Sequence, residues 1–190
     1  MAASDKVLLV PGLHNSGPLH WQSQWELKHP EYARVAQRDW ESPQLDEWAA
    51  ALDAAIRDAR GRVLLVAHSF GCLAALRRIA ARPEGVAGAL LVAPADPARF
   101  GLSEALFSGM PGVPLVFAAS RNDPWLAFDR AAGLARGLDA ELVDLGEAGH
   151  VNAASGYGPW PEGERLLAAL RSRVAKRERA LHLALAFAAF

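Results

Sequence analysis

Short aliphatic runs alternate along the chain with longer segments whose apolar residues recur at helical spacing. Most of the runs are almost continuously apolar, as expected of parallel strands that are buried on both faces. The second and sixth runs are more mixed, which is typical of strands at the edges of a sheet. The predicted strands are Val7–Val10, Arg34–Gln37, Arg62–Ala67, Gly88–Val92, Leu115–Ala119 and Glu141–Asp144.

The segments between these runs predict helices. The second helix has the clearest start: Ser42 is placed as N-cap, Pro43 as the first helical residue, and Asp46 and Glu47 in the first turn. The predicted helices are His20–Lys28, Pro43–Arg60, Phe70–Arg82, Ser103–Phe107, Trp125–Arg136 and Glu162–Arg179. Strand–helix alternation with right-handed crossovers predicts a doubly wound parallel sheet with helices on both faces. We expect the strand order 2-1-3-4-5-6.

Composition narrows the class of protein. The 190 residues are 52% hydrophobic, without a repeat or linker, which suits one domain over residues 1–176. A net charge of −1 gives no reason to expect a nucleic-acid partner. Histidine and cysteine spacings predict no metal site, and Gly12 to Gly17 lacks the dinucleotide-binding pattern, so we expect no cofactor. The first residues do not resemble a signal peptide and no apolar run reaches about 20 residues, so we expect a cytoplasmic protein without a membrane span.

A candidate nucleophile lies where the third strand meets the next helix. Ala67-His68-Ser69-Phe70-Gly71 follows an apolar run and leads directly into an Ala- and Leu-rich helix, which is the context of a nucleophile elbow. The turn is sharp, so the residues two before and two after the serine must be small, as Ala67 and Gly71 are. The helix N-terminus adds partial positive charge for a developing oxyanion. By the local pattern alone, Ser69 could also be an ordinary helix N-cap.

The loop after the first strand supplies candidate oxyanion-hole donors. In this architecture one amide follows the nucleophile and the other comes from a loop after an early strand. We expect the backbone N–H groups of Phe70 and Leu13 in these roles, with His14 as a near alternative for the second. The predicted strand order reverses between strands 1 and 3, so the Gly12 loop and Ser69 would face each other at a switch point, where ligands bind.

His150 is the candidate general base among the six histidines, because it lies after the last strand in a loop of small residues. Asp123 follows the fifth strand and is the candidate carboxylate, with Asp96 after the fourth strand as competitor. Asp123 could instead cap the helix at Trp125. The chain order Ser69, Asp123, His150 matches the α/β-hydrolase triad. His150 would accept the serine proton, and Asp123 would fix its tautomer.

Several longer motifs resemble the small single-domain serine hydrolases grouped with retinoblastoma-binding protein 9, also called YdeN-like, within the α/β-hydrolase superfamily. The matching motifs are Val10-Pro11-Gly12-Leu13-His14-Asn15-Ser16-Gly17-Pro18, His20-Trp21-Gln22, Asp39-Trp40, Ala67-His68-Ser69-Phe70-Gly71-Cys72, Arg121-Asn122-Asp123-Pro124, Gly149-His150-Val151-Asn152 and Gly156-Tyr157-Gly158-Pro159-Trp160-Pro161. The resemblance spans residues 7 to about 170. It implies a reduced fold that lacks the first two strands of the superfamily, no lid domain, and triad roles for Ser69, Asp123 and His150.

Three further residues are candidates for contact with substrate. His14 lies in the Gly12 loop, and His20 opens a helix beside Trp21. The segment around Trp160 is a candidate pocket wall, although Trp160 could equally belong to the core.

Residues 177–190 fall outside the resemblance. From Ala180 onward they are apolar on nearly every helical face, and such a helix is usually buried. We expect this extension to lengthen the last helix and to pack on the domain or on a second copy of the chain, forming a homodimer.

The combined features predict a serine hydrolase that acts through an acyl-enzyme on a small carboxylic ester, with thioesters and amides as variants. Only about 20 residues separate Val92 from Val113, so we expect no lid and an open site. The alternative function is a protein-interaction module with the same fold.

Overall fold

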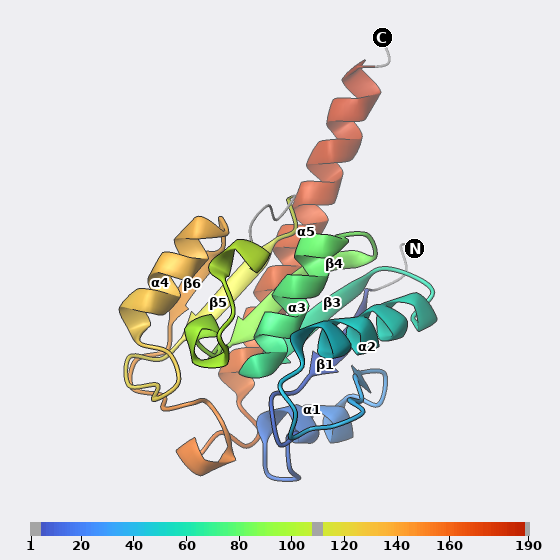
Figure 1. The fold of residues 1–190 in the computed structure, drawn as a ribbon. Coiled ribbons are helices and arrows are strands. Elements are labelled where there is room, and N and C mark those ends of the chain that lie inside the picture. The colour runs from blue at the N-terminus through green and yellow to red at the C-terminus, as the bar shows by residue number, and fades with distance from the viewer. Residues whose placement is uncertain (1–4, 108–111, 189–190) are drawn as a thin grey trace.

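A single parallel sheet organises the chain (Figure 1). The computed structural model describes residues 5–107 and 112–188. Its strands are β1 (Lys6–Val10), β2 (Ala33–Arg34), β3 (Val63–His68), β4 (Val86–Val92), β5 (Leu115–Ala119) and β6 (Glu141–Asp144). All neighbouring strands are parallel and their order is β2-β1-β3-β4-β5-β6, which confirms the predicted topology.

Helices cover both faces of the sheet. The α-helices are α1 (Trp21–Lys28), α2 (Leu45–Asp58), α3 (Phe70–Ala81), α4 (Phe128–Gly137) and α5 (Pro161–Ala188). Three short 3-10 helices are η1 (Pro97–Phe100), η2 (Glu104–Phe107) and η3 (Ala153–Ser155). Helices α2, α3 and α4 lie over one face, and α1 and α5 lie over the other (Figure 1).

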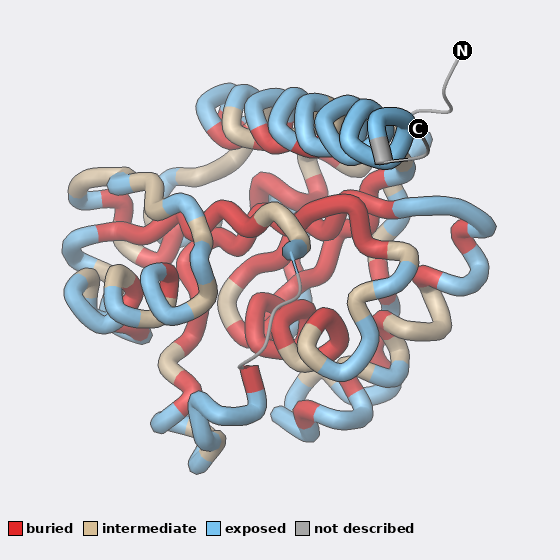
Figure 2. Tube along the Cα trace, turned by 90° about the horizontal axis from the view of Figure 1, so that it is seen from above, coloured by how far each residue is buried: buried red, intermediate tan, exposed pale blue. Residues whose placement is uncertain are grey.

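The central strands divide their side chains between two apolar clusters. In β3, Leu65 and Ala67 belong to the cluster under α2 and α3, and Leu64 and Val66 belong to the cluster under α1 and α5. Successive residues of a strand point to opposite faces, so a strand between two helical layers has to be apolar throughout. Figure 2 shows the buried segments gathered in the sheet and on the helix sides that face it.

Two predicted boundaries near the start of the chain are wrong. The second strand is Ala33–Arg34, shorter than the predicted Arg34–Gln37. Helix α2 begins at Leu45 with Gln44 as N-cap, and Ser42 does not cap it. Instead, the Ser42 carbonyl accepts hydrogen bonds from the Gln44 amide and from Nε1 of Trp48, both at 2.9 Å. Ser42 therefore lies in the turn before α2, and its carbonyl is hydrogen-bonded to the N-cap residue and to a side chain of the first helical turn.

Two later segments also differ from prediction. The predicted helix Ser103–Phe107 is the short 3-10 helix η2, which begins at Glu104, and the Ser103 hydroxyl accepts from the Ala105 amide. Helix α4 begins at Phe128, because the Trp125 amide is engaged by the Asp123 side chain in a preceding turn. The described part of the connection between β4 and β5 holds only η1 and η2, and its residues 108–111 lie outside the described residues.

Helix α5 has a buried half and a projecting half (Figure 1). Leu170 and Val174 are buried against the sheet. Further along, Leu181, Leu183, Leu185 and Phe187 are 54%, 57%, 71% and 78% exposed. The extension thus lengthens the last helix through Ala188, with residues 189 and 190 outside the described residues, but its apolar side chains do not pack on the body of the domain.

Within residues 5–107 and 112–188, the helices are either too short or too polar to cross a membrane.

Candidate active site

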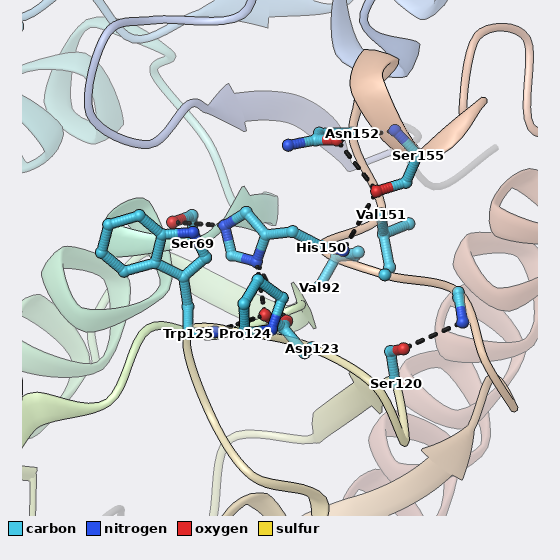
Figure 3. Close-up of polar contacts among 12 residues, drawn as sticks. Ser69, Val92, Ser120, Asp123, Pro124, Trp125, His150, Val151, Asn152 and Ser155 are labelled. Atoms are coloured by element: carbon cyan, nitrogen blue, oxygen red, sulfur yellow. Dashed lines mark hydrogen bonds and ion pairs between the residues drawn. The ribbon is translucent and has the colours of Figure 1, made fainter.

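Three side chains from separate loops meet at the carboxyl ends of the strands (Figure 3). Ser69 lies between β3 and α3, Asp123 follows β5, and His150 follows β6. Nε2 of His150 lies 2.9 Å from Oγ of Ser69, and Nδ1 of His150 lies 3.0 Å from both carboxylate oxygens of Asp123. The Asp123 side chain is only 2% exposed. The structure therefore brings together the three residues named from the sequence.

The turn at Ser69 is held in a rarely adopted backbone conformation, with φ of 54° and ψ of −125°. Its shape depends on two glycines. A side chain at Gly71 would overlap the carbonyl oxygens of Val10 and Pro11, and a Cβ at Gly12 would lie 2.8 Å from Cβ of Ser69. The end of β1 thus packs directly beneath the start of α3, as the small-residue requirement of the elbow demands.

The candidate oxyanion-hole donors are the backbone amides of Phe70, which follows Ser69, and of Leu13, which lines the same cavity as Ser69. In the described part of the chain, no acceptor engages the N–H groups of Leu13 and Phe70. The alternative donor, the His14 amide, is already bound to the Trp40 carbonyl at 2.9 Å. An oxyanion hole needs fixed donors that have no other acceptor, so that they can bind the charge that develops on the substrate. Leu13 therefore fits this role better than His14.

The Asp123 carboxylate is oriented by two donors. Its Oδ1 accepts the Trp125 amide at 2.8 Å, and both oxygens face Nδ1 of His150. A proton on Nδ1 leaves the lone pair of Nε2 for the hydroxyl of Ser69. The competitor Asp96 is engaged elsewhere, because its Oδ1 caps η1 through the Ala98 amide and pairs with Arg130 at 2.9 Å.

Side chains from other loops hold the backbone around His150. The amide of Ala148 donates to Oγ of Ser120 at 2.9 Å, and the amide of Gly149 donates to Oδ1 of Asn122 at 2.6 Å. The His150 amide donates to Oγ of Ser155 at 3.2 Å (Figure 3). Sequence reasoning missed Ser120, Asn122 and Ser155. The place of Asn122 beside Asp123 was the only signal available for them.

A cavity of about 280 Å³ opens over the nucleophile. One side is apolar, with Leu13, Phe100 and Trp125, and the other side carries imidazoles and amides. Its lining comprises Leu13, His14, Asn15, His20, His68, Ser69, Phe100, Trp125, His150 and Asn152. None of these described residues is Lys, Arg, Asp or Glu. Sequence reasoning did not name Phe100, Trp125 or Asn152, because they reach the cavity only through the packing of separate loops.

Trp125 forms an exposed wall of this cavity. Its side chain is 42% exposed, and the guanidinium of Arg99 lies over the ring at 5.2 Å from the centroid. Arg99 also donates to the Pro124 carbonyl at 2.7 Å. These two contacts fix an indole beside the ring of His150, at a centroid separation of 6.0 Å.

The predicted substrate contacts separate into two groups. His14 and His20 line the cavity, and Nδ1 of His14 also pairs with Glu41 at 2.6 Å. Trp160 does not line it. Its ring is 5% exposed and packs against Trp21 and Trp25, so we assign Trp160 to the core and not to the pocket wall.

Two buried imidazoles beside the triad remain uncharged. Burial, reinforced by the charges of Arg34 and His150, lowers the pKa of His20 from 6.5 to about 4. Burial, with His20 and His150 nearby, also lowers the pKa of His68 well below 6.5. Nδ1 of His20 accepts the Gln22 amide at 3.2 Å and so caps α1. Near neutral pH both rings are therefore neutral.

The described residues contain no group of three or more His, Cys, Asp or Glu side chains arranged to hold a metal ion.

The lowered pKa of His20 predicts a loss of stability in mild acid. Between pH 6.5 and 4 the unfolded state binds a proton that the folded state excludes, so the free energy of unfolding falls as the pH falls through this range. His20→Asn keeps a capping acceptor and removes this titration. The test measures the free energy of unfolding in urea at pH 7.5 and at pH 4.5. Between these two pH values, we expect it to fall by ~1–3 kcal/mol more in the wild type than in His20→Asn. Equal losses in the two proteins would contradict the assignment.

Comparisons with known proteins agree with this architecture. The sequence profile of the family described as "Serine hydrolase" matches residues 7–169. A YdeN-like hydrolase of Pectobacterium atrosepticum is 42% identical, over 89% of this chain and 91% of that chain, with a TM-score of 0.84. The product of the Bacillus subtilis ydeN gene is 22% identical, over 88% of this chain and 99% of that chain, with a TM-score of 0.73. No curated protein sequence matched the chain.

A carboxylesterase of Bacillus cereus shares the fold at 18% identity, over 83% of this chain and 88% of that chain, with a TM-score of 0.55. The profile match and the Pectobacterium relative confirm the family resemblance noted from the motifs. The chain therefore belongs to the serine hydrolase family of small, YdeN-like proteins with the α/β-hydrolase fold.

Proposed function

We propose that this serine hydrolase acts through a triad of Ser69, His150 and Asp123. One observation carries the proposal: Nε2 of His150 lies 2.9 Å from Oγ of Ser69 while Nδ1 faces the Asp123 carboxylate at 3.0 Å. The proposed nucleophile is thus within hydrogen-bond reach of the proposed base, and the base is within reach of the carboxylate that orients it.

The reaction follows from these positions. His150 accepts the Ser69 proton as Oγ attacks the substrate carbonyl, and the N–H groups of Leu13 and Phe70 stabilise the oxyanion. Collapse of the tetrahedral intermediate expels the leaving group, which takes the proton from His150, and leaves an acyl-enzyme on Ser69. Water, deprotonated by His150, then attacks the acyl carbonyl. The bond between the acyl carbon and Oγ of Ser69 breaks, the carboxylic acid is released, and Oγ takes the proton back from His150. Asp123 keeps the imidazole in one tautomer and stabilises its protonated form.

We propose a small, uncharged carboxylic ester as the substrate. The cavity of about 280 Å³ lies at the lower end of the range for small-molecule sites, and no Lys, Arg, Asp or Glu side chain lines it in the described part of the chain. Leu13, Phe100 and Trp125 offer an apolar wall for one half of the ester. Thioesters and amides undergo the same acyl transfer.

The first test is labelling with a fluorophosphonate probe. We expect the folded wild type to be labelled, Ser69→Ala to show no labelling, and His150→Ala to be labelled on the order of 100-fold more slowly, because the serine loses its base. Ser172→Ala is a matched control, since Ser172 is an exposed serine on α5. Folded wild-type protein that resists the probe would favour the alternative, an interaction module with little catalysis.

The second test separates the two candidate carboxylates. Asp123→Asn removes the charge that faces His150, so we expect kcat for a small ester to fall on the order of 10³-fold or more. Asp96→Asn removes a pairing with Arg130 outside the cavity, so kcat should change less than about 3-fold. Steady-state kinetics of both variants decides the matter, and similar losses would refute the assignment of Asp123.

We also propose that the projecting end of α5 pairs with the same segment of a second copy. Its exposed leucines and Phe187 form an apolar surface, and a monomer rarely leaves so large a patch uncovered. In a two-fold dimer the same patch of each subunit covers the other, so the end of α5 is enough to form both halves of the interface.

Light scattering after size exclusion tests this pairing. We expect a wild-type dimer, and a monomer with unchanged esterase activity for the variant carrying Leu181→Glu and Leu185→Glu. Ser172→Glu is the control. It also introduces a negative charge, at an exposed position of α5 that is nearer the domain, and this variant should stay dimeric. A wild type that is monomeric at every concentration would exclude the pairing.

A further inference from the structure

A buried histidine next to the nucleophile contacts the loop of the general base. His68 is the last residue of β3 and precedes Ser69 in the chain. Its Nε2 lies 2.9 Å from the carbonyl oxygen of His150, which is 82 residues away. The two imidazole rings are also in contact, at a centroid separation of 4.8 Å. One residue therefore bonds covalently to the nucleophile and non-covalently to the base.

The protonation of His68 suits it to this contact. Burial lowers the pKa of His68 well below its ordinary range, so the ring is neutral and carries a single N–H. A carbonyl oxygen can only accept, so that proton lies on Nε2 and is donated to His150. The loop is thereby held by a fixed donor that does not change its charge near neutral pH.

The loop requires such restraint because it contains two residues with positive φ, of which only the glycine adopts this conformation readily. Gly149 has φ of 56°, and Val151, a β-branched residue, has φ of 46°. Positive φ is costly for a β-branched residue and persists only where the surroundings impose it. The Val151 carbonyl accepts Nε1 of Trp21 at 2.9 Å, across 130 residues. Two consecutive carbonyls of the loop are thus anchored by buried side chains.

We propose that His68 and Trp21 are positioning residues, which fix the imidazole of His150 over Ser69 by holding the carbonyl groups of His150 and Val151. Neither side chain acts on the substrate in this role. The inference rests on the proposed triad. Two hydrogen bonds, from His68 and from Trp21, keep the strained loop in the conformation that the triad geometry requires. Losing either bond lets the loop relax and moves His150 away from Ser69.

His68→Met and His68→Gln test the first anchor. Methionine fills a similar volume without a donor, and the glutamine amide restores one at similar reach. For hydrolysis of a small ester, we expect His68→Met to lower kcat about 10- to 100-fold with KM changed less than about 3-fold, since small misplacements of a catalytic group affect the chemical step. His68→Gln should recover kcat to within several-fold of the wild type.

Trp21→Phe tests the second anchor and remains informative if His68→Met does not fold. It removes Nε1–H while keeping an aromatic ring, and we expect the same loss in kcat. Trp25→Phe is the matched control: Trp25 lies on the same helix in the same cluster, but its Nε1 donates to the Pro159 carbonyl, which lies beyond η3 and just before α5. Its kcat should stay within about 2-fold of the wild type. Equal losses of kcat in Trp21→Phe and Trp25→Phe would show that the effect comes from general destabilisation, and this would overturn the proposal.

A readout independent of turnover separates this inference from the proposed function. The Nδ1 proton shared by His150 and Asp123 should give a downfield proton NMR resonance in the wild type, His68→Gln and Trp25→Phe. We expect it to broaden or vanish in His68→Met and Trp21→Phe. An unchanged resonance in those two variants overturns the positioning role. A wild type that shows the resonance but neither reacts with the probe nor hydrolyses esters overturns the proposed function alone.

Discussion

The close approach of two neighbouring strands is the constraint on which the site depends. Val10 and Ala67 are paired at the ends of β1 and β3, and the chain leaves both strands in tight turns. Gly12 and Gly71 make this contact, and neither position has room for another side chain. Because the turns touch, the nucleophile and both candidate oxyanion donors lie within one small region. Apolar packing on both faces of the sheet holds the strands in this register.

Electrostatics then distinguishes one histidine from its neighbours. His20, His68 and His150 lie side by side, with centroid separations of 4.7 Å and 4.8 Å between successive rings. Of these three rings, only that of His150 faces a carboxylate, that of Asp123, and it is the candidate to accept the Ser69 proton. The other two rings are kept neutral by burial, and they provide shape and hydrogen bonds without competing for the proton. The Asp123 carboxylate therefore distinguishes His150 as the candidate base among the three histidines.

Features governed by local sequence could be predicted, and features governed by long-range contacts could not. Strand order and the placement of Ser69, Asp123 and His150 follow from apolar runs and from the residues that end them. Side chains that hold a distant backbone group, such as Asn122, have no periodic signal. The failed helix start at Ser42 has a local origin, because the Ser42 carbonyl accepts hydrogen bonds from Gln44 and Trp48 and so lies in a turn before the helix. Trp160 satisfied a local pattern for a pocket wall, yet three aromatic neighbours draw it into the core.

The bond between Trp21 and the Val151 carbonyl links segments 130 residues apart, and this separation has a consequence for synthesis. Because synthesis runs from the N-terminus, Trp21 and Ser69 leave the ribosome before the His150 loop does. Until that loop docks, Trp21 lacks this acceptor and Ser69 has no imidazole of His150 beside it. Acyl transfer by the proposed triad therefore requires that nearly the whole domain has been synthesised and folded.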